Sequence, residues 1–174
     1  MPNYCQNKLI IRGKNKDIAS FVSSYLALQD GFSFNSFIPE PTSKLECPSN
    51  YLLADKNDAN VRRLAYGEYD PKNWFDWYSW HCDKWGTKWD VCSCNYNVSK
   101  NYNLVTIWFD TAWSPSVPVV EKMIEMFPNL NITYYYFEAG SFFGGGYNDR
   151  DGWYEVSEKD LSKFASNKGF GRYI

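Results

Sequence analysis

Two groups of residues could in principle serve as a nucleophile or as metal ligands. One is an adjacent histidine–cysteine pair, and the other is two cysteines two positions apart. Adjacent residues on a helix point about 100° apart, so His81 is poorly placed to activate Cys82 as a nucleophile. Cys92 and Cys94 share one face of a predicted strand and are expected to point inward as core residues. Zinc binding there would need His81 or Cys82 to join them, and His81 is expected at a partly exposed helix end. The residues therefore predict no nucleophilic or metal centre.

Carboxylates and a glycine run are the other candidates for catalysis. Asp76 stands apart, and although Asp90 and Asp110 can approach one another, Glu138 is expected at the opposite end of the sheet. No pair is thus placed at the distance that general acid–base chemistry needs. The glycines at 144–146 lack the Lys-Ser/Thr tail of a phosphate loop and are interpreted as a hairpin turn. We expect a protein that is not an enzyme and holds no cofactor or metal.

Composition narrows the class of protein further. The 174 residues fit a single domain, carry a net charge of -2 and are 20% aromatic. The mean hydropathy of -0.52, with so many aromatics, argues against a membrane protein and a disordered chain. The near-neutral charge argues against binding duplex DNA. The absence of a secretory signal and the odd number of cysteines, 5, predict a cytoplasmic protein.

Hydrophobic periodicity predicts the elements that must position these residues. Alternation predicts strands, apolar residues at i, i+3 and i+4 predict helices, and Gly, Pro and Asn-rich stretches separate them. The predicted strands are 4–11, 91–99, 104–110 and 131–138, with a terminal hairpin of 142–147 and 153–156; the predicted helices start at Asp17, after Ser114-Pro115-Ser116 and after Ser157.

The order of these elements predicts an α+β fold. A β-α-β-β-α-β order with right-handed crossovers gives a ferredoxin-like antiparallel sheet with both helices on one face. A helical insertion at about 39–84 separates the first helix from the central hairpin, and an extension at about 157–174 follows the terminal hairpin. All of this belongs to one domain, residues 1–174. The strand 131–138 is expected at the sheet edge, where Tyr135 could face a partner chain unless the terminal hairpin covers that edge.

Six short motifs resemble a known family in their order along the chain. They are Met1-Pro2-Asn3-x-Cys5-x-Asn7, Phe34-Asn35-x-x-Ile38-Pro39, Trp85-Gly86-Thr87-Lys88-Trp89-Asp90, Phe109-x-Thr111-Ala112-Trp113-Ser114-Pro115, Phe127-Pro128-x-Leu130 and Glu138-x-Gly140-x-x-Phe143-x-Gly145. Over residues 1 to about 156 the chain resembles the YubB/Api92-like ferredoxin-like proteins, which are uncharacterised and carried by phages, plasmids and genomic islands. The resemblance implies a ferredoxin-like fold and residence in a mobile genetic element, and it assigns no activity.

Two of these motifs are predicted to meet at one end of the sheet. A turn centred near Lys100-Asn101 would place Asp90 opposite Thr111 and Lys88 near Trp113, beside the start of the second helix. Lys88 and the helix N-terminus could hold an anion on which a tryptophan stacks. Packing of the insertion on the sheet edge is the favoured explanation, with Asp90 paired to Lys88 or Thr111. The candidate binding residues are Trp85, Lys88, Trp89, Asp90, Thr111, Trp113 and Ser114.

The open face of the sheet is the second candidate surface. Thr106 and Trp108 are expected on the face away from the helices, together with Tyr4. Aromatics on such a face can stack bases, but the pI of 5.4 and the absence of an RNA-recognition signature argue against nucleic acid. We expect the insertion to cover this face instead.

The sequence thus favours a non-catalytic, cytoplasmic accessory protein of a phage or plasmid. The partner would be a host protein, with counter-defence as one such role, because aromatic residues are enriched in interface cores. The first alternative is a protein that binds a small anion or nucleotide near Lys88 and Trp113. The second alternative is a protein that binds single-stranded nucleic acid through Trp108. The oligomeric state stays open.

Overall fold

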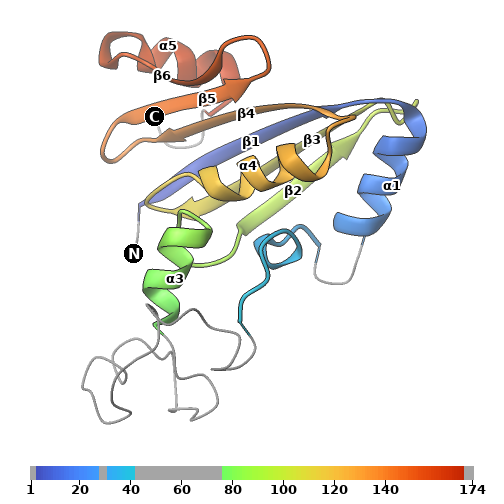
Figure 1. The fold of residues 1–174 in the computed structure, drawn as a ribbon. Coiled ribbons are helices and arrows are strands. Elements are labelled where there is room, and N and C mark those ends of the chain that lie inside the picture. The colour runs from blue at the N-terminus through green and yellow to red at the C-terminus, as the bar shows by residue number, and fades with distance from the viewer. Residues whose placement is uncertain (1–2, 28–30, 42–75, 171–174) are drawn as a thin grey trace.

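In a computed structural model that describes residues 3–27, 31–41 and 76–170, strands and helices follow the predicted order (Figure 1). The elements are β1 (Tyr4–Arg12), α1 (Asn15–Tyr25), the 3-10 helix η1 (Phe34–Ser36), α3 (Trp77–Lys84), β2 (Cys92–Val98), β3 (Leu104–Ala112), α4 (Val117–Met126), β4 (Asn131–Glu138), β5 (Phe143–Asn148), β6 (Gly152–Glu155) and α5 (Glu158–Lys168). Most of the predicted insertion, residues 42–75, lies outside the described residues. The bounds of the insertion, and its place within a single domain, therefore stay a prediction.

The strands form one sheet in the order β2-β3-β1-β4-β5-β6, with every neighbouring pair antiparallel. The first four strands in the chain, with α1 and α4 as crossovers, make the split β-α-β arrangement, and the predicted ferredoxin-like α+β fold is confirmed. The terminal hairpin β5–β6 pairs with β4. This is the alternative in which the terminal hairpin covers the edge of 131–138, so β4 is an inner strand and Tyr135 does not lie on a free edge.

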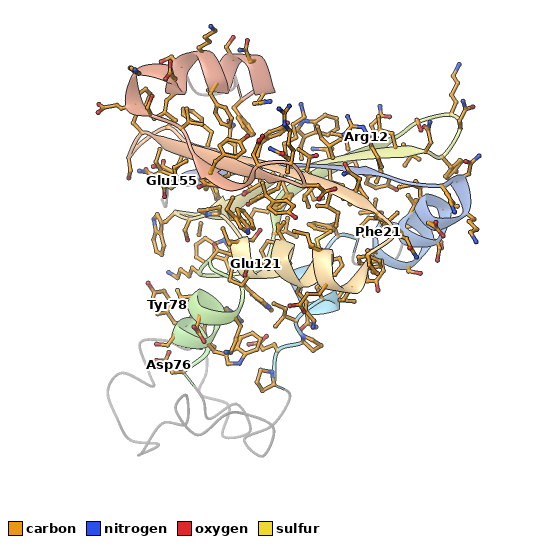
Figure 2. The ribbon with its side chains drawn as sticks, turned by 45° about the horizontal axis from the view of Figure 1, so that its top comes forward. Arg12, Phe21, Asp76, Tyr78, Glu121 and Glu155 are labelled. Atoms are coloured by element: carbon orange, nitrogen blue, oxygen red, sulfur yellow. The ribbon has the colours of Figure 1, made fainter. Side chains whose placement is uncertain are left out.

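The layer between the sheet and the helices α1 and α4 holds the main core (Figure 2). On β1 and β3 alternate residues are buried, as their period-two pattern predicts. The two helices contribute their apolar stripes to the same layer. The buried residues include Leu9 and Ile11 of β1, Val105, Ile107 and Phe109 of β3, Ile18 and Phe21 of α1, and Val120 and Met123 of α4.

The C-terminal helix α5 covers part of the opposite face of the sheet (Figure 1). Phe137 of β4 is buried there with Leu161, Ala165 and Phe170. The insertion was predicted to cover this face, but its described part lies elsewhere, with α3 against α4. On β1, β3 and β2 the face away from α1 and α4 keeps half-exposed side chains such as Trp108.

The glycine run is part of a strand and not a turn. Gly144, Gly145 and Gly146 lie in β5 and are buried between β4 and β6. A Cβ added to Gly145 would lie 2.4 Å from the backbone oxygen of Tyr154 and 2.5 Å from the Tyr136 hydroxyl. The absence of side chains lets neighbouring tyrosines approach this strand, and the predicted turn at 144–146 is wrong for that reason.

The central hairpin has a different register from the predicted one. Val98 pairs with Val105, further along β3 than a turn at Lys100-Asn101 would place it, because the loop includes Tyr102 at a φ of +49°. A bulge at Ser93, which has a φ of +50°, then shifts the register of β2 against β3 between Cys92 and Asn95. On the edge strand β2, Cys94 is exposed and Cys92 is half-buried, so the prediction that both point inward as core residues is wrong.

The buried Tyr134 and the half-buried Tyr154 make the fold sensitive to high pH. Burial raises the pKa of Tyr154 from 10.0 to about 12, and burial holds the pKa of Tyr134 well above its ordinary value. The unfolded chain therefore releases these protons at lower pH than the folded chain, so stability present below pH 10 is lost as the pH rises toward 12. We expect absorbance at 295 nm and circular dichroism to change together over that window. Titration of these tyrosines with no change in circular dichroism would contradict this.

No helix in the described parts of the chain is long and apolar enough to cross a membrane.

Candidate functional site

The segments 85–90 and 111–115 meet beside the start of α4, as predicted. The Thr87 hydroxyl donates to the backbone oxygen of Ala112 at 3.0 Å and accepts from its N–H at 3.1 Å. The Ser114 hydroxyl donates to the Gly86 oxygen at 2.6 Å. The contact partners differ from the predicted ones, because the register of the hairpin is shifted.

The first turn of α4 is covered by the chain itself. Gly86 has a φ of +77°, and a Cβ there would lie 2.8 Å from Cδ of Pro118 and 2.9 Å from the oxygen of Pro115. The Ser116 N–H donates to the Tyr134 hydroxyl at 3.2 Å. Gly86 thus occupies the space that an anion would need against this helix terminus, which argues against the anion-binding alternative.

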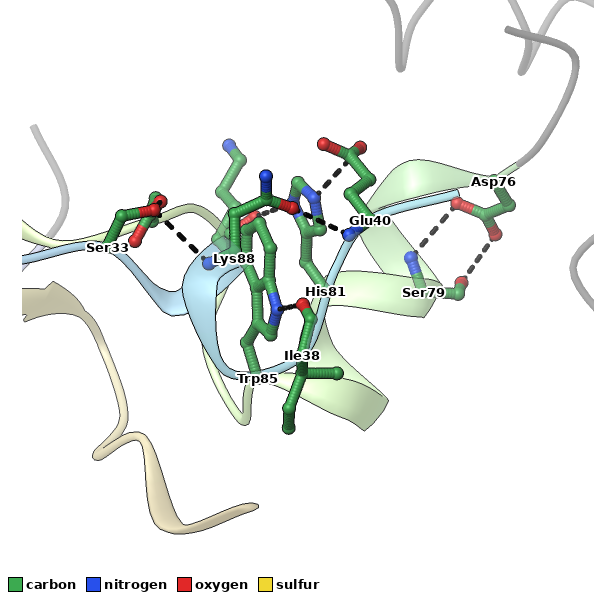
Figure 3. Close-up of polar contacts among 10 residues, drawn as sticks. Ser33, Ile38, Glu40, Asp76, Ser79, His81, Trp85 and Lys88 are labelled. Atoms are coloured by element: carbon green, nitrogen blue, oxygen red, sulfur yellow. Dashed lines mark hydrogen bonds and ion pairs between the residues drawn. The ribbon is translucent and has the colours of Figure 1, made fainter. Parts of the chain in front are cut away.

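Trp85 belongs to the core. Its side chain is buried and stacks on the His81 ring with centroids 4.1 Å apart and planes at 12°. Its indole N–H donates to the Ile38 oxygen at 2.9 Å (Figure 3). Trp85 therefore joins the segment at Ile38 to α3 and has no surface to offer a ligand.

His81 is buried beside Trp85, and the prediction of a partly exposed residue is wrong. Its Nδ1 lies 2.8 Å from the Lys88 backbone oxygen and its Nε2 lies 3.1 Å from the Glu40 carboxylate (Figure 3). Both ring nitrogens thus face oxygen atoms of other segments. His81 ties residues on three segments together.

Asp90 is also a structural residue. Its carboxylate accepts from the Ser33 hydroxyl at 2.5 Å and from the N–H groups of Phe34 and Val91, each at 2.7 Å. The expected hydrogen bond from Thr111 is replaced, because the Thr111 hydroxyl donates to the Ser114 oxygen at 2.6 Å. Asp90 therefore anchors η1 to the start of β2.

Four side chains remain at this end of the sheet as a partly exposed group, which we call the Trp113 cluster: Tyr78, Lys88, Trp89 and Trp113. The Lys88 ammonium lies 4.9 Å from the centroid of the Trp89 ring, 5.1 Å from that of Trp113 and 5.9 Å from that of Tyr78. Trp113 is 43% exposed. The cluster is a surface of aromatic rings gathered around one cation.

The backbone of Trp113 has an uncommon conformation. Its φ is +66°, and the Ser114 N–H donates to the Ala112 oxygen at 2.8 Å, which closes a γ-turn. A left-handed conformation costs a residue with a side chain about 1–2 kcal/mol. The Trp113 N–H donates to the Asn3 oxygen at 2.9 Å, so hydrogen bonds on both sides hold the turn. This turn directs a large apolar ring into solvent.

A buried polar network lies beneath the turn. The Asn7 amide donates to the Cys5 oxygen at 2.8 Å and to the Thr111 hydroxyl at 2.9 Å, and it accepts from the Tyr134 hydroxyl. Thr111 is fully buried. Thr111 therefore positions the turn and is not available to a ligand.

Trp108 and Tyr135, the other candidates, lie on the face opposite α1 and α4. Both are half-buried. Tyr135 packs edge-on against Phe164 with centroids 6.2 Å apart, and the Lys168 ammonium lies 3.9 Å from its ring centroid. Helix α5 thus covers Tyr135, whereas Trp108 borders an open hollow.

Asp76 and Glu138 make hydrogen bonds within the chain. Asp76 caps α3 by accepting from the Ser79 N–H at 3.0 Å, and the buried Glu138 accepts from the Gly140 N–H at 2.7 Å. Glu138 and Asp110 lie at the same end of the sheet, because β3 and β4 are both antiparallel to β1, and the prediction of opposite ends is wrong. They pair with successive residues of β1 and so face opposite sides. Within residues 3–27, 31–41 and 76–170 no three His, Cys, Asp or Glu side chains form a metal-binding group.

Sequence reasoning missed Lys8, Lys168 and Tyr78 as members of candidate surfaces. The contact of the Lys8 ammonium with the Lys168 oxygen at 3.0 Å joins residues at opposite ends of the chain. No local pattern could predict that contact. Tyr78 was assigned only to the predicted helical insertion.

Comparison with known proteins finds a family model that matches part of the chain. Residues 84–166 match the family described as a ferredoxin-like domain in Api92-like protein. A crystal structure of a protein api92 from Yersinia pseudotuberculosis aligns with a TM-score of 0.47 and 9% identity, over 90% of this chain and 99% of that chain. No curated protein matches the chain.

Proposed function

We propose that this chain, whose residues 84–166 belong to the family of ferredoxin-like domains in Api92-like proteins, is a non-catalytic accessory protein that binds a host protein through the Trp113 cluster. The resemblance of its sequence motifs to proteins of phages and plasmids extends the proposal to a role in a mobile genetic element. A bacterial protein, such as a component of a defence system, would then be the partner.

The conformation of Trp113 is the observation that carries the proposal. Folding gains little from an indole that is 43% exposed, yet the chain holds this residue at a φ of +66°. Strained backbone of this kind persists only where the surroundings impose it, and it concentrates at functional sites. Tryptophan is also the residue type most enriched among interface hot spots. A partner that buries the indole would recover the apolar contact that the free protein lacks.

The cation in the cluster indicates the chemistry of the partner surface. Lys88 lies against two indole rings, so its charge is presented next to apolar area. A partner with an apolar pocket bordered by a carboxylate would complement both features. Catalysis by the neighbouring groups is not part of the proposal, because Asp90, His81 and Thr111 are each engaged in contacts within the chain.

Site-specific photo-crosslinking in living bacteria tests this function. Benzoylphenylalanine replaces Tyr78 in the cluster, and in the matched control it replaces Tyr102, which is 46% exposed in the β2–β3 turn. We expect an adduct with one host protein from position 78 and none from position 102. The adduct is then identified by mass spectrometry.

Two variants at Trp113 separate loss of binding from loss of folding. Trp113→Gly and Trp113→Ala both remove the indole, but only glycine adopts the positive φ without strain. The free energy of unfolding of Trp113→Gly should therefore be about 1 kcal/mol higher than that of Trp113→Ala. Both variants are expected to abolish the adduct at position 78. An adduct of unchanged yield in Trp113→Gly, or no adduct with the native Trp113, would reject the proposed function.

A further inference from the structure

On the sheet face opposite α1 and α4, the described residues leave a hollow of about 330 Å³. Trp108 and Asp110 of β3 line it, with Gln6 of β1, Asn95 of β2 and Phe170 after α5. The volume is within the range of small-molecule sites, roughly 300–1,000 Å³. Its lining combines an aromatic ring with amide and carboxylate groups, which suits a planar ligand that carries polar groups on its edge.

Strand register places a row of side chains across this face. Trp108 pairs with Asn95 on one side and with Lys8 on the other, and Lys8 pairs with Tyr135. The Lys8 ammonium lies 5.7 Å from the centroid of the Trp108 ring. The Lys8 ammonium therefore lies beside the Trp108 ring that lines the hollow, and the Asn95 amide lies on the other side of that ring.

Lys8 and Lys168 meet beside this row of side chains. The Lys8 ammonium donates to the Lys168 backbone oxygen at 3.0 Å, and the Lys168 ammonium lies 3.9 Å from the Tyr135 ring centroid. Neither lysine makes an ion pair with any described residue. Burial and the charge of Lys168 both lower the pKa of Lys8. A bound anion would offset both effects.

We propose that this hollow binds a nucleoside phosphate, with the base stacked on Trp108 and the phosphate held by Lys8 and Lys168. The amides of Gln6 and Asn95 can each donate to and accept from the edge of a base. Stacking of a base on an aromatic ring contributes about 1–3 kcal/mol and tolerates every base, since each has a π face. The ligand is a free nucleotide or one nucleotide of a single strand, because both present the same chemistry.

The charge of the site sets the salt dependence of binding. For a single strand, two lysines would contact one or two phosphates, so log K should fall with log salt with a slope of about -0.7 to -1.4. A steeper slope would indicate that the anionic ligand also binds non-specifically to other parts of the protein surface. The net charge of -2 makes such non-specific binding of an anion unfavourable.

Direct binding measurements on the full chain test the proposal. The probes are the four ribonucleoside monophosphates, followed by protein fluorescence, and a fluorescein-labelled oligouridylate, followed by anisotropy, at low salt. Trp108→Ala is expected to weaken binding about tenfold or more, and Lys8→Gln about fivefold. Lys159→Gln, which removes the same charge at an exposed position of α5, is the matched control and should bind as wild type does.

The outcomes separate the two sources of the ligand and decide the proposal. Binding of the monophosphates indicates a free nucleotide, and binding of the oligonucleotide alone indicates a strand; both support the site. Absence of binding to every probe, or unchanged binding in both Trp108→Ala and Lys8→Gln, overturns it. If Trp108→Ala fails to fold, the comparison of Lys8→Gln with Lys159→Gln decides. Trp113→Gly should bind nucleotide normally, so this site and the Trp113 cluster fail independently.

Discussion

Replacement of Gly145 by alanine is expected to lower the free energy of unfolding by about 3 kcal/mol, the upper part of the range for overpacking in a core. The added Cβ would lie 2.4 Å from a backbone oxygen of β6, and it would also meet the Tyr136 hydroxyl at 2.5 Å. A side chain can rotate away from such a contact, but a paired strand cannot move without losing its hydrogen bonds to β5. Urea unfolding at 25 °C, followed by circular dichroism, measures the loss.

Gly144 provides the matched control for this prediction. It lies in the same strand, but the nearest atom to its added Cβ is the Tyr136 backbone oxygen at 3.0 Å, so a small adjustment accommodates the methyl group. Gly144→Ala is expected to cost about 1 kcal/mol. Equal losses for Gly144→Ala and Gly145→Ala would mean that β5 can shift, and that close approach of β6 does not explain the glycine run.

The glycine run also shows where prediction from sequence fails. Glycine carries no side chain, so residues 144–146 have no hydrophobic periodicity and resemble a turn. Their strand conformation is imposed by β4 and β6, whose tyrosines fill the space above them. The strand Asn131–Glu138, by contrast, was predicted with its observed bounds, because its own β-branched and aromatic residues specify it.

The candidate site was predictable to the level of segments but not of contacts. The meeting of 85–90 with 111–115 follows from the hairpin that joins them. The partners were misassigned because Tyr102 and Ser93 adopt positive φ values, which lengthen the turn and add a bulge. Contacts over long sequence separation, such as Lys8 with Lys168, depend on how α5 docks and leave no local pattern. Trp113 was among the candidate binding residues, and its γ-turn was not foreseen.

Replacement of Asn7 by alanine is expected to cost about 3 kcal/mol of stability. The Asn7 amide joins β1, β3 and β4 beneath the Trp113 turn through Thr111 and Tyr134. Removing it leaves both hydroxyls without that partner in a buried site, and each unsatisfied group costs about 1–3 kcal/mol. Asn7→Asp is the conservative comparison, since it keeps the acceptor for the Tyr134 hydroxyl and loses the donors.

A double-mutant cycle with Tyr134→Phe isolates the shared hydrogen bond. Tyr134→Phe alone is expected to cost about 1–2 kcal/mol, because the hydroxyl also accepts from the Ser116 N–H at 3.2 Å. In the Asn7→Ala background, Tyr134→Phe removes a hydroxyl that has already lost one hydrogen-bond partner. The stability losses of the two single variants should therefore sum to more than the stability loss of the double variant. We expect a coupling of about 1 kcal/mol in urea unfolding. Strict additivity would mean that Asn7 and Tyr134 stabilise the sheet separately, and that no connected network supports the turn that exposes Trp113.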